Sequence, residues 1–135
     1  METEMDLRSL APRRIAVFRA LFLGDLLCSI PALNALDRRF PDAEITLVGL
    51  PWAKELAERL PAVDHFAEFP GYPGIPEVPC GPGRMTDFLA EARRVGYDLA
   101  IQLHGSGEIS NGFVADLGAS TSLGFGPADD KRLSL

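Results

Sequence analysis

Residues 14–36 of the chain read RIAVFRALFLGDLLCSIPALNAL. Residues 15–18 form a short, continuous apolar run, of the kind found in strands that are covered on both faces of a sheet. From residue 25 onward, apolar side chains recur at helical spacing, at Leu26, Ile30, Leu33 and Leu36. The segment therefore predicts a buried strand, a loop over residues 19–24 and a helix that begins at Asp25.

Pro31 interrupts this helical pattern. A proline inside a helix removes the hydrogen bond to the carbonyl four residues earlier, here that of Leu27, and crowds that carbonyl. The helix is therefore expected either to bend at Pro31 or to begin there, and we favour the bend.

The same alternation of strand and helix continues along the chain. Further strands are predicted over residues 44–49, 65–69, 97–103 and 120–125, and helices over residues 51–60, 85–95 and 109–117. Gly96 is expected to end one of these helices in a left-handed turn. Alternating strands and helices with short connections imply parallel strands joined by right-handed crossovers. The predicted fold class is therefore α/β, a doubly wound, Rossmann-like parallel sheet with helices on both faces.

Local composition divides the chain into three parts. Residues 1–13 are expected to be a flexible lead, residues 14–127 the Rossmann-like domain, and residues 128–135 a polar, frayed tail. Between residues 70 and 83 the sequence has five prolines and four glycines, a density that predicts an irregular surface loop. A binding role and simple mobility are both open for this loop.

Composition and charge limit the classes of protein to which the chain can belong. The 135 residues suit one domain that folds alone, and 47% hydrophobic with 24% charged residues is ordinary for a globular protein. The net charge of −6 repels polyanions, so no nucleic-acid partner is expected. Cys28 and Cys80 provide no framework for disulfides or a metal site and are expected to be free thiols.

The first residues are acidic and lack the basic and apolar stretches that export requires. A cytoplasmic location is therefore expected. No run of about 18 apolar residues occurs, so no membrane span is predicted. Peripheral attachment at the inner face of the cytoplasmic membrane stays open.

Ligands of open parallel sheets bind beyond the carboxyl ends of the strands, which directs attention to the loops after the first and fourth strands. The first loop ends in Gly24 and Asp25, which sets a carboxylate at a helix N-terminus. On position alone, the reading that Asp25 is only an N-cap is favoured, because this is a common use of Asp. Gly24 is expected to supply a positive φ angle or room for a ligand, although a glycine in a turn is also ordinary.

The second loop, residues 104–107, has the sequence His-Gly-Ser-Gly. Gly105 and its neighbours could turn backbone amides toward a ligand, or could form only a tight turn in which Ser106 is a cap. His104 could donate to a phosphate, accept from a sugar hydroxyl or be a satisfied polar residue. These alternatives are balanced on sequence grounds.

Several other chemistries lack their motifs. The G-x-G-x-x-G fingerprint is missing after the first strand, and neither G-x-S-x-G nor G-x-x-x-x-G-K-[ST] occurs. Two histidines and two separated cysteines do not make a zinc site, so no metal is expected.

The order and spacing of several short segments carry a resemblance to a known family. The segments are residues 19–25, Pro31 to Leu33 with Leu36, residues 40–48, residues 97–107, and Gly118-Ala119 leading to residues 123–125. Together they resemble glycosyltransferase family 9, the ADP-heptose:lipopolysaccharide heptosyltransferases and their relatives, over roughly Arg14 to Pro127.

The resemblance implies an inverting, metal-independent glycosyltransferase without a cofactor, built as two Rossmann-like domains in the GT-B arrangement. This chain is similar to the N-terminal, acceptor-side half, so a separate C-terminal domain would bind the donor, ADP-heptose or another nucleotide sugar. By position Asp25 matches the general base, with Arg19, Gly24, His104, Gly105 and Ser106 on the acceptor side. Arg19 could bind a phosphate or carboxylate of a lipopolysaccharide core sugar, or could pair with Asp25.

Three functions follow for such a chain. The first is half of a heptosyltransferase acting on a lipopolysaccharide-type or other glycan acceptor, inactive alone. The second is a binding or regulatory module that uses the same crevice without catalysis. The third is a nonfunctional remnant that forms a homodimer through its exposed inter-domain face.

Overall fold

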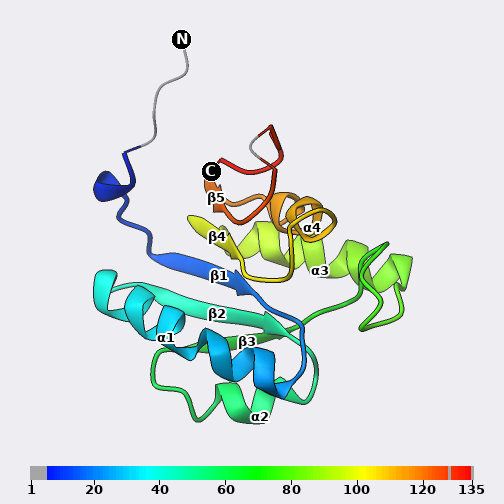
Figure 1. Ribbon diagram of the computed structural model, residues 1–135, viewed down its shortest axis with the longest axis horizontal. Helices are drawn as coiled ribbons and strands as arrows, with labels where there is room; N and C mark the ends of the chain where they lie inside the picture. The colour runs from blue at the N-terminus through cyan, green and yellow to red at the C-terminus, as the bar shows by residue number, and fades with distance from the viewer. Residues whose placement is uncertain (1–5, 128, 135) are drawn as a thin grey trace.

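A computed structural model describes residues 6–127 and 129–134. Its one sheet has the strand order β3-β2-β1-β4-β5, and every pairing in it is parallel (Figure 1). The elements in chain order are η1 (Leu7–Ser9), β1 (Arg14–Phe18), α1 (Leu23–Arg39), β2 (Glu44–Gly49), α2 (Ala53–Ala57), β3 (His65–Glu68), α3 (Pro82–Val95), β4 (Leu99–Gln102), α4 (Ser110–Asp116) and β5 (Thr121–Leu123). The predicted fold class is confirmed.

Strand β1 lies in the middle of the sheet. Its Phe18 pairs with Val48 of β2 on one side and with Gln102 of β4 on the other. Residues 15–18 are fully buried, which explains why the sequence there is apolar without alternation: helices cover both faces of the strand.

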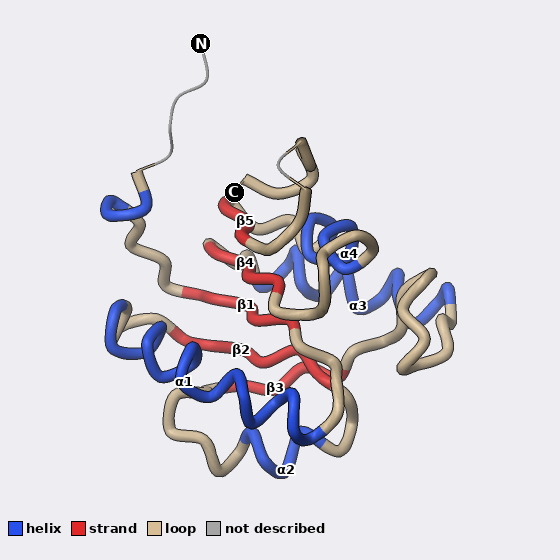
Figure 2. Tube along the Cα trace, viewed as in Figure 1, coloured by secondary structure: helices blue, strands red, loops and turns tan. Residues whose placement is uncertain are grey.

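Two helices cover each face of the sheet, α1 and α2 on one and α3 and α4 on the other (Figure 2). Leu33 of α1 packs with Ile15 and Ile45 on the first face. Phe113 of α4 packs with Phe18 and with Phe69, just after β3, on the second. The helices of each face thus supply a separate apolar layer.

Helix α1 begins two residues earlier than predicted, at Leu23, and continues through Pro31 to Arg39. The alternative that the helix begins at Pro31 is therefore wrong. The N-cap is Phe22, with no capping side chain, and Asp25 lies in the first turn. The alternative that Asp25 is only an N-cap is therefore also wrong.

Helix α3 also begins earlier than expected, at Pro82 instead of Met85. A proline at the first position of a helix costs nothing because its missing N–H would have had no partner there. Gly96 ends the helix with a φ of 75°, in the left-handed conformation that was predicted.

Most other differences are shorter elements than the sequence pattern indicated. Helix α2 covers only Ala53–Ala57, β4 begins at Leu99 and β5 has three residues. Asp98 lies just before β4, and its carboxylate accepts hydrogen bonds from the backbone N–H groups of Arg13 and Arg14, at 2.8 and 3.0 Å. Apolar pattern alone does not show such side-chain bonds.

The Pro/Gly segment packs against the domain up to the start of α3. Ile75 is buried, and a backbone bridge joins it to Tyr72. The Tyr72 hydroxyl donates a 2.9 Å hydrogen bond to Asp116 at the end of α4. The Pro/Gly segment is therefore attached to α4 through Tyr72.

The predicted lead and tail lie partly outside the described residues, which exclude 1–5, 128 and 135. In the lead, the backbone carbonyl of Arg8 accepts a hydrogen bond from Arg39 of α1. In the tail, Ser134 exchanges two hydrogen bonds with Ser122 of β5, and Leu133 packs against the core. The described part of the tail thus lies against the sheet. Within the described chain, no helix combines the length and apolarity needed to cross a membrane.

Candidate functional site

The loops after β1 and β4 lie side by side at the point where the strand order reverses. From β1 the chain adds β2 and β3 on one side, and then β4 and β5 on the other. Strands β1 and β4 are neighbours, but α1 and α4, which follow them, cover opposite faces of the sheet. In doubly wound folds this divergence opens a crevice at the carboxyl ends of the two strands, where ligands bind. The predicted site residues belong to these two loops and to the first turn of α1.

Asp25 lies in the first turn of α1, at this end of the sheet. Its side chain is 51% exposed, and its Oδ1 lies 3.9 Å from a terminal guanidinium nitrogen of Arg19. The first turn of α1 places the carboxylate close to the positive end of the helix dipole. The carboxylate is therefore both accessible to a ligand and next to positive charge.

Arg19 connects Asp25 to the end of β4. Its Nε donates a 2.6 Å hydrogen bond to the backbone carbonyl of Asp25, and one terminal nitrogen donates to the backbone carbonyl of Leu103. The side chain is mostly buried. Arg19 therefore uses much of its donor capacity within the protein, which fits a role in holding Asp25 in place.

His104 is buried between the two loops. Its ring stacks on Phe18, with ring centroids 4.8 Å apart, and its Nδ1 accepts a 3.1 Å hydrogen bond from the backbone N–H of Ala20. Nδ1 is thus an acceptor, so the proton of the neutral ring is on Nε2. Burial lowers the pKa of His104 below its usual value of 6.5, and Arg19 acts in the same direction, against the opposing effects of Glu77 and Asp25.

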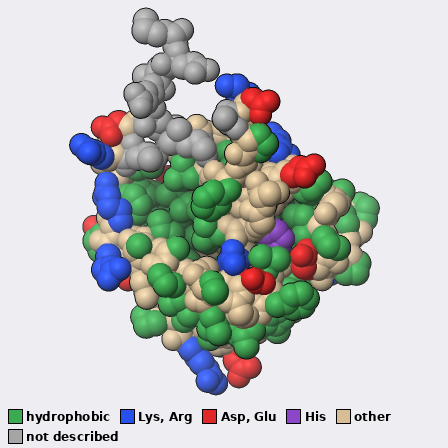
Figure 3. Space-filling view, viewed as in Figure 1, with side chains coloured by type: hydrophobic (Ala, Val, Ile, Leu, Met, Phe, Trp, Pro, Cys, Tyr) green, Lys and Arg blue, Asp and Glu red, His purple; other side chains and the backbone are tan. Residues whose placement is uncertain are grey.

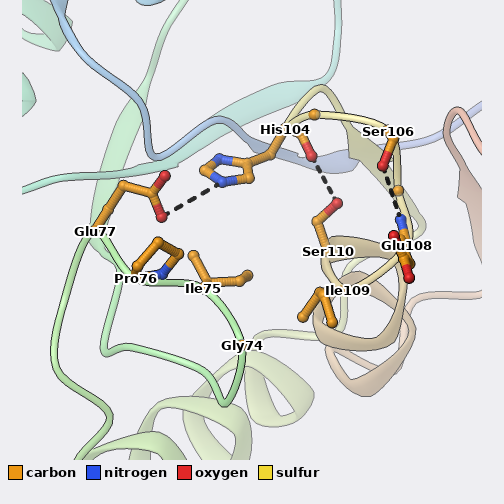
Figure 4. Close-up of a pocket in the computed structure, with 11 residues that line it drawn as sticks. Gly74, Ile75, Pro76, Glu77, His104, Ser106, Glu108, Ile109 and Ser110 are labelled. Carbon is orange, nitrogen blue, oxygen red and sulfur yellow. Dashed lines mark hydrogen bonds and ion pairs between the residues drawn. The ribbon is translucent and has the colours of Figure 1, made fainter.

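A pocket of about 180 Å³ lies beside His104, between the β4–α4 loop and the Pro/Gly segment (Figure 4). Glu77 enters it from the Pro/Gly segment and points toward His104, with 3.9 Å between its Oε2 and Nε2 of the ring. Sequence reasoning missed Glu77. The available signal was that Glu77 is the one charged residue between positions 70 and 83.

Gly105, Ser106 and Gly107 form the tight turn that was one of the two predicted readings. Gly105 and Gly107 have φ angles of 72° and 88°. A Cβ on Gly107 would lie 1.9 Å from the backbone oxygen of Phe125, whereas a Cβ on Gly105 would meet nothing within 4 Å. Gly107 is therefore required by packing, while Gly105 and the exposed Ser106 remain open to a ligand.

Buried polar side chains from β4 and α4 hold this turn in place through hydrogen bonds. Gln102 Oε1 accepts a 2.6 Å hydrogen bond from the backbone N–H of His104, and Gln102 Nε2 donates to Asn111 of α4 at 2.9 Å. Ser110 Oγ donates to the backbone carbonyl of His104 at 2.6 Å. The loop is thus held at both ends by side chains of the elements that it connects.

Gly24 does not have the positive φ angle that was one of its predicted roles. It is the second residue of α1, and a Cβ there would meet nothing within 4 Å. Room for a ligand at Gly24 stays a prediction, and so does the alternative that the glycine has no special role. Among the described residues, no three His, Cys, Asp or Glu side chains gather as a set of metal ligands.

Large hydrophobic side chains are exposed around the carboxyl edge of the sheet, and we call them the apolar rim. The rim consists of Phe22, Leu23, Leu27, Trp52, Ile109 and Phe125. Phe22 is 70% and Phe125 67% exposed. Figure 3 shows hydrophobic side chains around a histidine with acidic and basic neighbours near the middle of one face. Exposed apolar surface therefore lies close to these polar groups.

Comparison with known proteins gives matches among solved structures. No family model and no curated protein matches the chain. A glycosyltransferase family 9 protein from Veillonella parvula DSM 2008 matches with a TM-score of 0.64 and 25% identity, over 87% of this chain and 33% of that chain. ADP-heptose lps heptosyltransferase II of E. coli matches with a TM-score of 0.65 and 22% identity, over 82% of this chain and 30% of that one.

A third similar structure is that of E. coli heptosyltransferase WaaC with ADP, with a TM-score of 0.58, 19% identity and coverage of 82% and 34% of the two chains. The present chain thus spans about a third of the length of each of the three. It is a Rossmann-like chain that resembles glycosyltransferase family 9 and has the fold of part of a heptosyltransferase.

Proposed function

We propose that the chain is the acceptor-side, N-terminal half of an inverting glycosyltransferase. In this proposal the enzyme that contains both halves transfers heptose or a related sugar from ADP-heptose or another nucleotide sugar to a lipopolysaccharide-type or other glycan acceptor, and this half is inactive alone. The observation that carries the proposal is the accessible Asp25 carboxylate at the crevice between β1 and β4. The likeness to family 9 structures supports it independently.

Asp25 is the general base of the proposed reaction. An acceptor hydroxyl attacks the anomeric carbon of the donor, a new carbon–oxygen bond forms, and the bond to the nucleoside diphosphate breaks. The hydroxyl becomes acidic only as its oxygen bonds to an oxocarbenium-like carbon, so its proton passes to the carboxylate late in the reaction. A positioned base of this kind contributes about 10²–10⁴-fold to the rate.

Arg19 is the positioning residue for this base. Its Nε donates a hydrogen bond to the backbone carbonyl of Asp25, and a terminal nitrogen donates one to the backbone carbonyl of Leu103, just after β4. The carboxylate is therefore held at a constant place relative to the crevice, and proximity of that kind is a large part of catalysis.

The donor would be bound by a separate domain that covers the apolar rim. Exposed apolar patches of this kind mark surfaces that another protein or domain contacts. The rim residues follow strands at the same edge of the sheet as Asp25 and His104, so a domain seated on the rim would also cover these two side chains. A second copy of this chain is the alternative occupant, which gives a homodimer.

The test uses this chain with and without the donor-binding domain of a heptosyltransferase. We expect negligible transfer from ADP-heptose by the chain alone and measurable transfer when the second domain is supplied. Asp25→Asn should lower that transfer by about 10²-fold or more. Asp37→Asn, which makes the same change at the other end of α1, is the matched control and should keep the rate.

Transfer that persists in Asp25→Asn would overturn the proposed mechanism. Binding of a core glycan with no transfer in any pairing would instead favour a binding or regulatory module. Glycan titrations by calorimetry separate these two outcomes.

A further inference from the structure

The pocket beside His104 contains an acceptor atom that the protein leaves without a partner. Oε2 of Glu77 is buried and makes no hydrogen bond. Its 3.9 Å separation from Nε2 of His104 is too long for a direct hydrogen bond. Because an unsatisfied buried acceptor is costly, the arrangement favours a group that enters between the two side chains.

The side chain of His104 presents a donor to the same gap. Its Nδ1 is occupied by the N–H of Ala20, so the proton of the neutral ring is on Nε2, the atom that faces Glu77. A gap between one donor and one acceptor matches a group that can both accept and donate. A hydroxyl has this property, whereas a phosphate or carboxylate at neutral pH offers only acceptors.

The charge of the pocket points to the same class of ligand. Glu77 and Glu108 line it, and none of its described lining residues is Lys or Arg. A neutral His104 leaves the carboxylate of Glu77 uncompensated, and the nearby Arg19 is engaged with backbone carbonyls. Like charges that approach in such a site repel each other, so an anionic ligand is disfavoured.

Part of the pocket wall is apolar. Ile75 and Ile109 lie below the polar pair, one from each of the two segments that form the pocket (Figure 4). Sugar rings combine hydroxyl groups with apolar C–H surface, and this pocket offers complementary surfaces to both. The volume of about 180 Å³ admits a single small unit rather than an extended chain.

We propose that Glu77 is a specificity-determining residue that, together with His104, binds a hydroxyl of an uncharged sugar unit and rejects a phosphorylated one. The proposal rests on the proposed function in taking this sugar to be part of the acceptor. It assigns a role to the Pro/Gly segment, which carries Glu77 into the crevice. It also replaces the expectation that this side of the crevice binds an anionic group of the acceptor.

Binding is tested on the 135-residue chain with methyl-labelled isoleucines, observed by NMR. Methyl mannoside and its 6-phosphate are the two probes. We expect the neutral glycoside to shift the methyl signals of Ile75 and Ile109 and to bind at least tenfold more tightly than the phosphate. Glu77→Gln should weaken neutral binding about tenfold, as for loss of one charge-assisted hydrogen bond, and should reduce the preference over the phosphate.

Two further variants keep the result interpretable. Glu77→Asp retains the charge but shortens the side chain, so it should lose neutral binding while it still rejects the phosphate. Glu58→Gln makes the same change as Glu77→Gln on an exposed position next to α2 and should match the unmodified chain. A dispersed amide spectrum verifies that each variant is folded.

The proposal is overturned if neither glycoside moves the two isoleucine signals, if the phosphate binds as well as the neutral sugar, or if Glu77→Gln behaves like Glu58→Gln. Neutral binding that depends on Glu77 in a chain that never supports transfer would sustain this inference and reject the proposed function. Transfer that depends on Asp25 but is indifferent to Glu77→Gln would do the reverse.

Discussion

At the scale of single residues, the two loops that meet at the crevice are held by contacts that cross between them. His104 from one loop accepts a hydrogen bond from Ala20 in the other, and Arg19 reaches back to Leu103. Asp25 is thus fixed relative to β4 through its arginine neighbour. The resemblance named Arg19, Asp25 and His104 in advance, but no sequence pattern showed that Arg19 would bond to Leu103 or that His104 would bond to Ala20.

Gly24 and Gly107 should respond oppositely to replacement by alanine. A Cβ on Gly24 meets no atom within 4 Å, and alanine is the better helix former, so Gly24→Ala should leave the free energy of unfolding unchanged or raise it by up to about 1 kcal/mol. A Cβ on Gly107 would clash with the backbone at a φ of 88°, so Gly107→Ala should lower it by about 2 kcal/mol or more.

Urea unfolding measures both changes. If a substrate or a second domain approaches Gly24, the stable Gly24→Ala variant should also show reduced transfer. Destabilisation by Gly24→Ala would instead mean that the fold of this domain requires the glycine.

At the scale of elements, the strongest patterns were read correctly and the exceptions have local causes. The continuous apolar run of β1 and the left-handed Gly96 agree with expectation. The start of α3 at Pro82 was missed because proline was taken as a breaker, although the first position of a helix tolerates it. The contact between Glu77 and His104 was missed because nothing in the sequence indicates where an irregular segment folds back.

Tyr72 provides a pH-dependent test of how the Pro/Gly segment is anchored. Burial, together with the hydrogen bond to Asp116 and the charge of that residue, raises the pKa of Tyr72 from 10.0 to about 12, against an opposing effect of Arg132. The folded state therefore keeps a proton that the unfolded state loses. The stabilisation is complete below pH 10 and should disappear as the pH rises toward 12.

The measurement is urea unfolding over this alkaline range, with a spectrophotometric titration of the phenols. Tyr72→Phe should remove the late-titrating phenol, so that the free energy of unfolding changes less between pH 10 and 12. An unchanged profile in Tyr72→Phe would show that the hydroxyl does not anchor the segment.

At the scale of the whole molecule, the candidate site and the apolar rim both lie at the carboxyl edge of the sheet. Asp25 and His104 follow β1 and β4 at this edge, and the residues of the apolar rim follow β1, β2, β4 and β5. The parallel order of the strands was predictable from the alternation of elements. The position of the rim follows from that order, because all the carboxyl ends of parallel strands point the same way.

We expect the chain to self-associate through the rim when no donor-binding domain is present. Light scattering should show a mass that rises with protein concentration. The double variant Phe22→Ser, Phe125→Ser should remain monomeric, because it replaces the two most exposed aromatic side chains of the rim. A chain that stays monomeric at every concentration contradicts this expectation.

The hydrogen bonds between Ser134 and Ser122 have a consequence for aggregation. They occupy backbone groups on the outer side of β5, where an unprotected strand would act as a template for a strand from another molecule. Cross-chain extension of the sheet is thereby blocked at that border. At that border, contacts between molecules are then left to side chains.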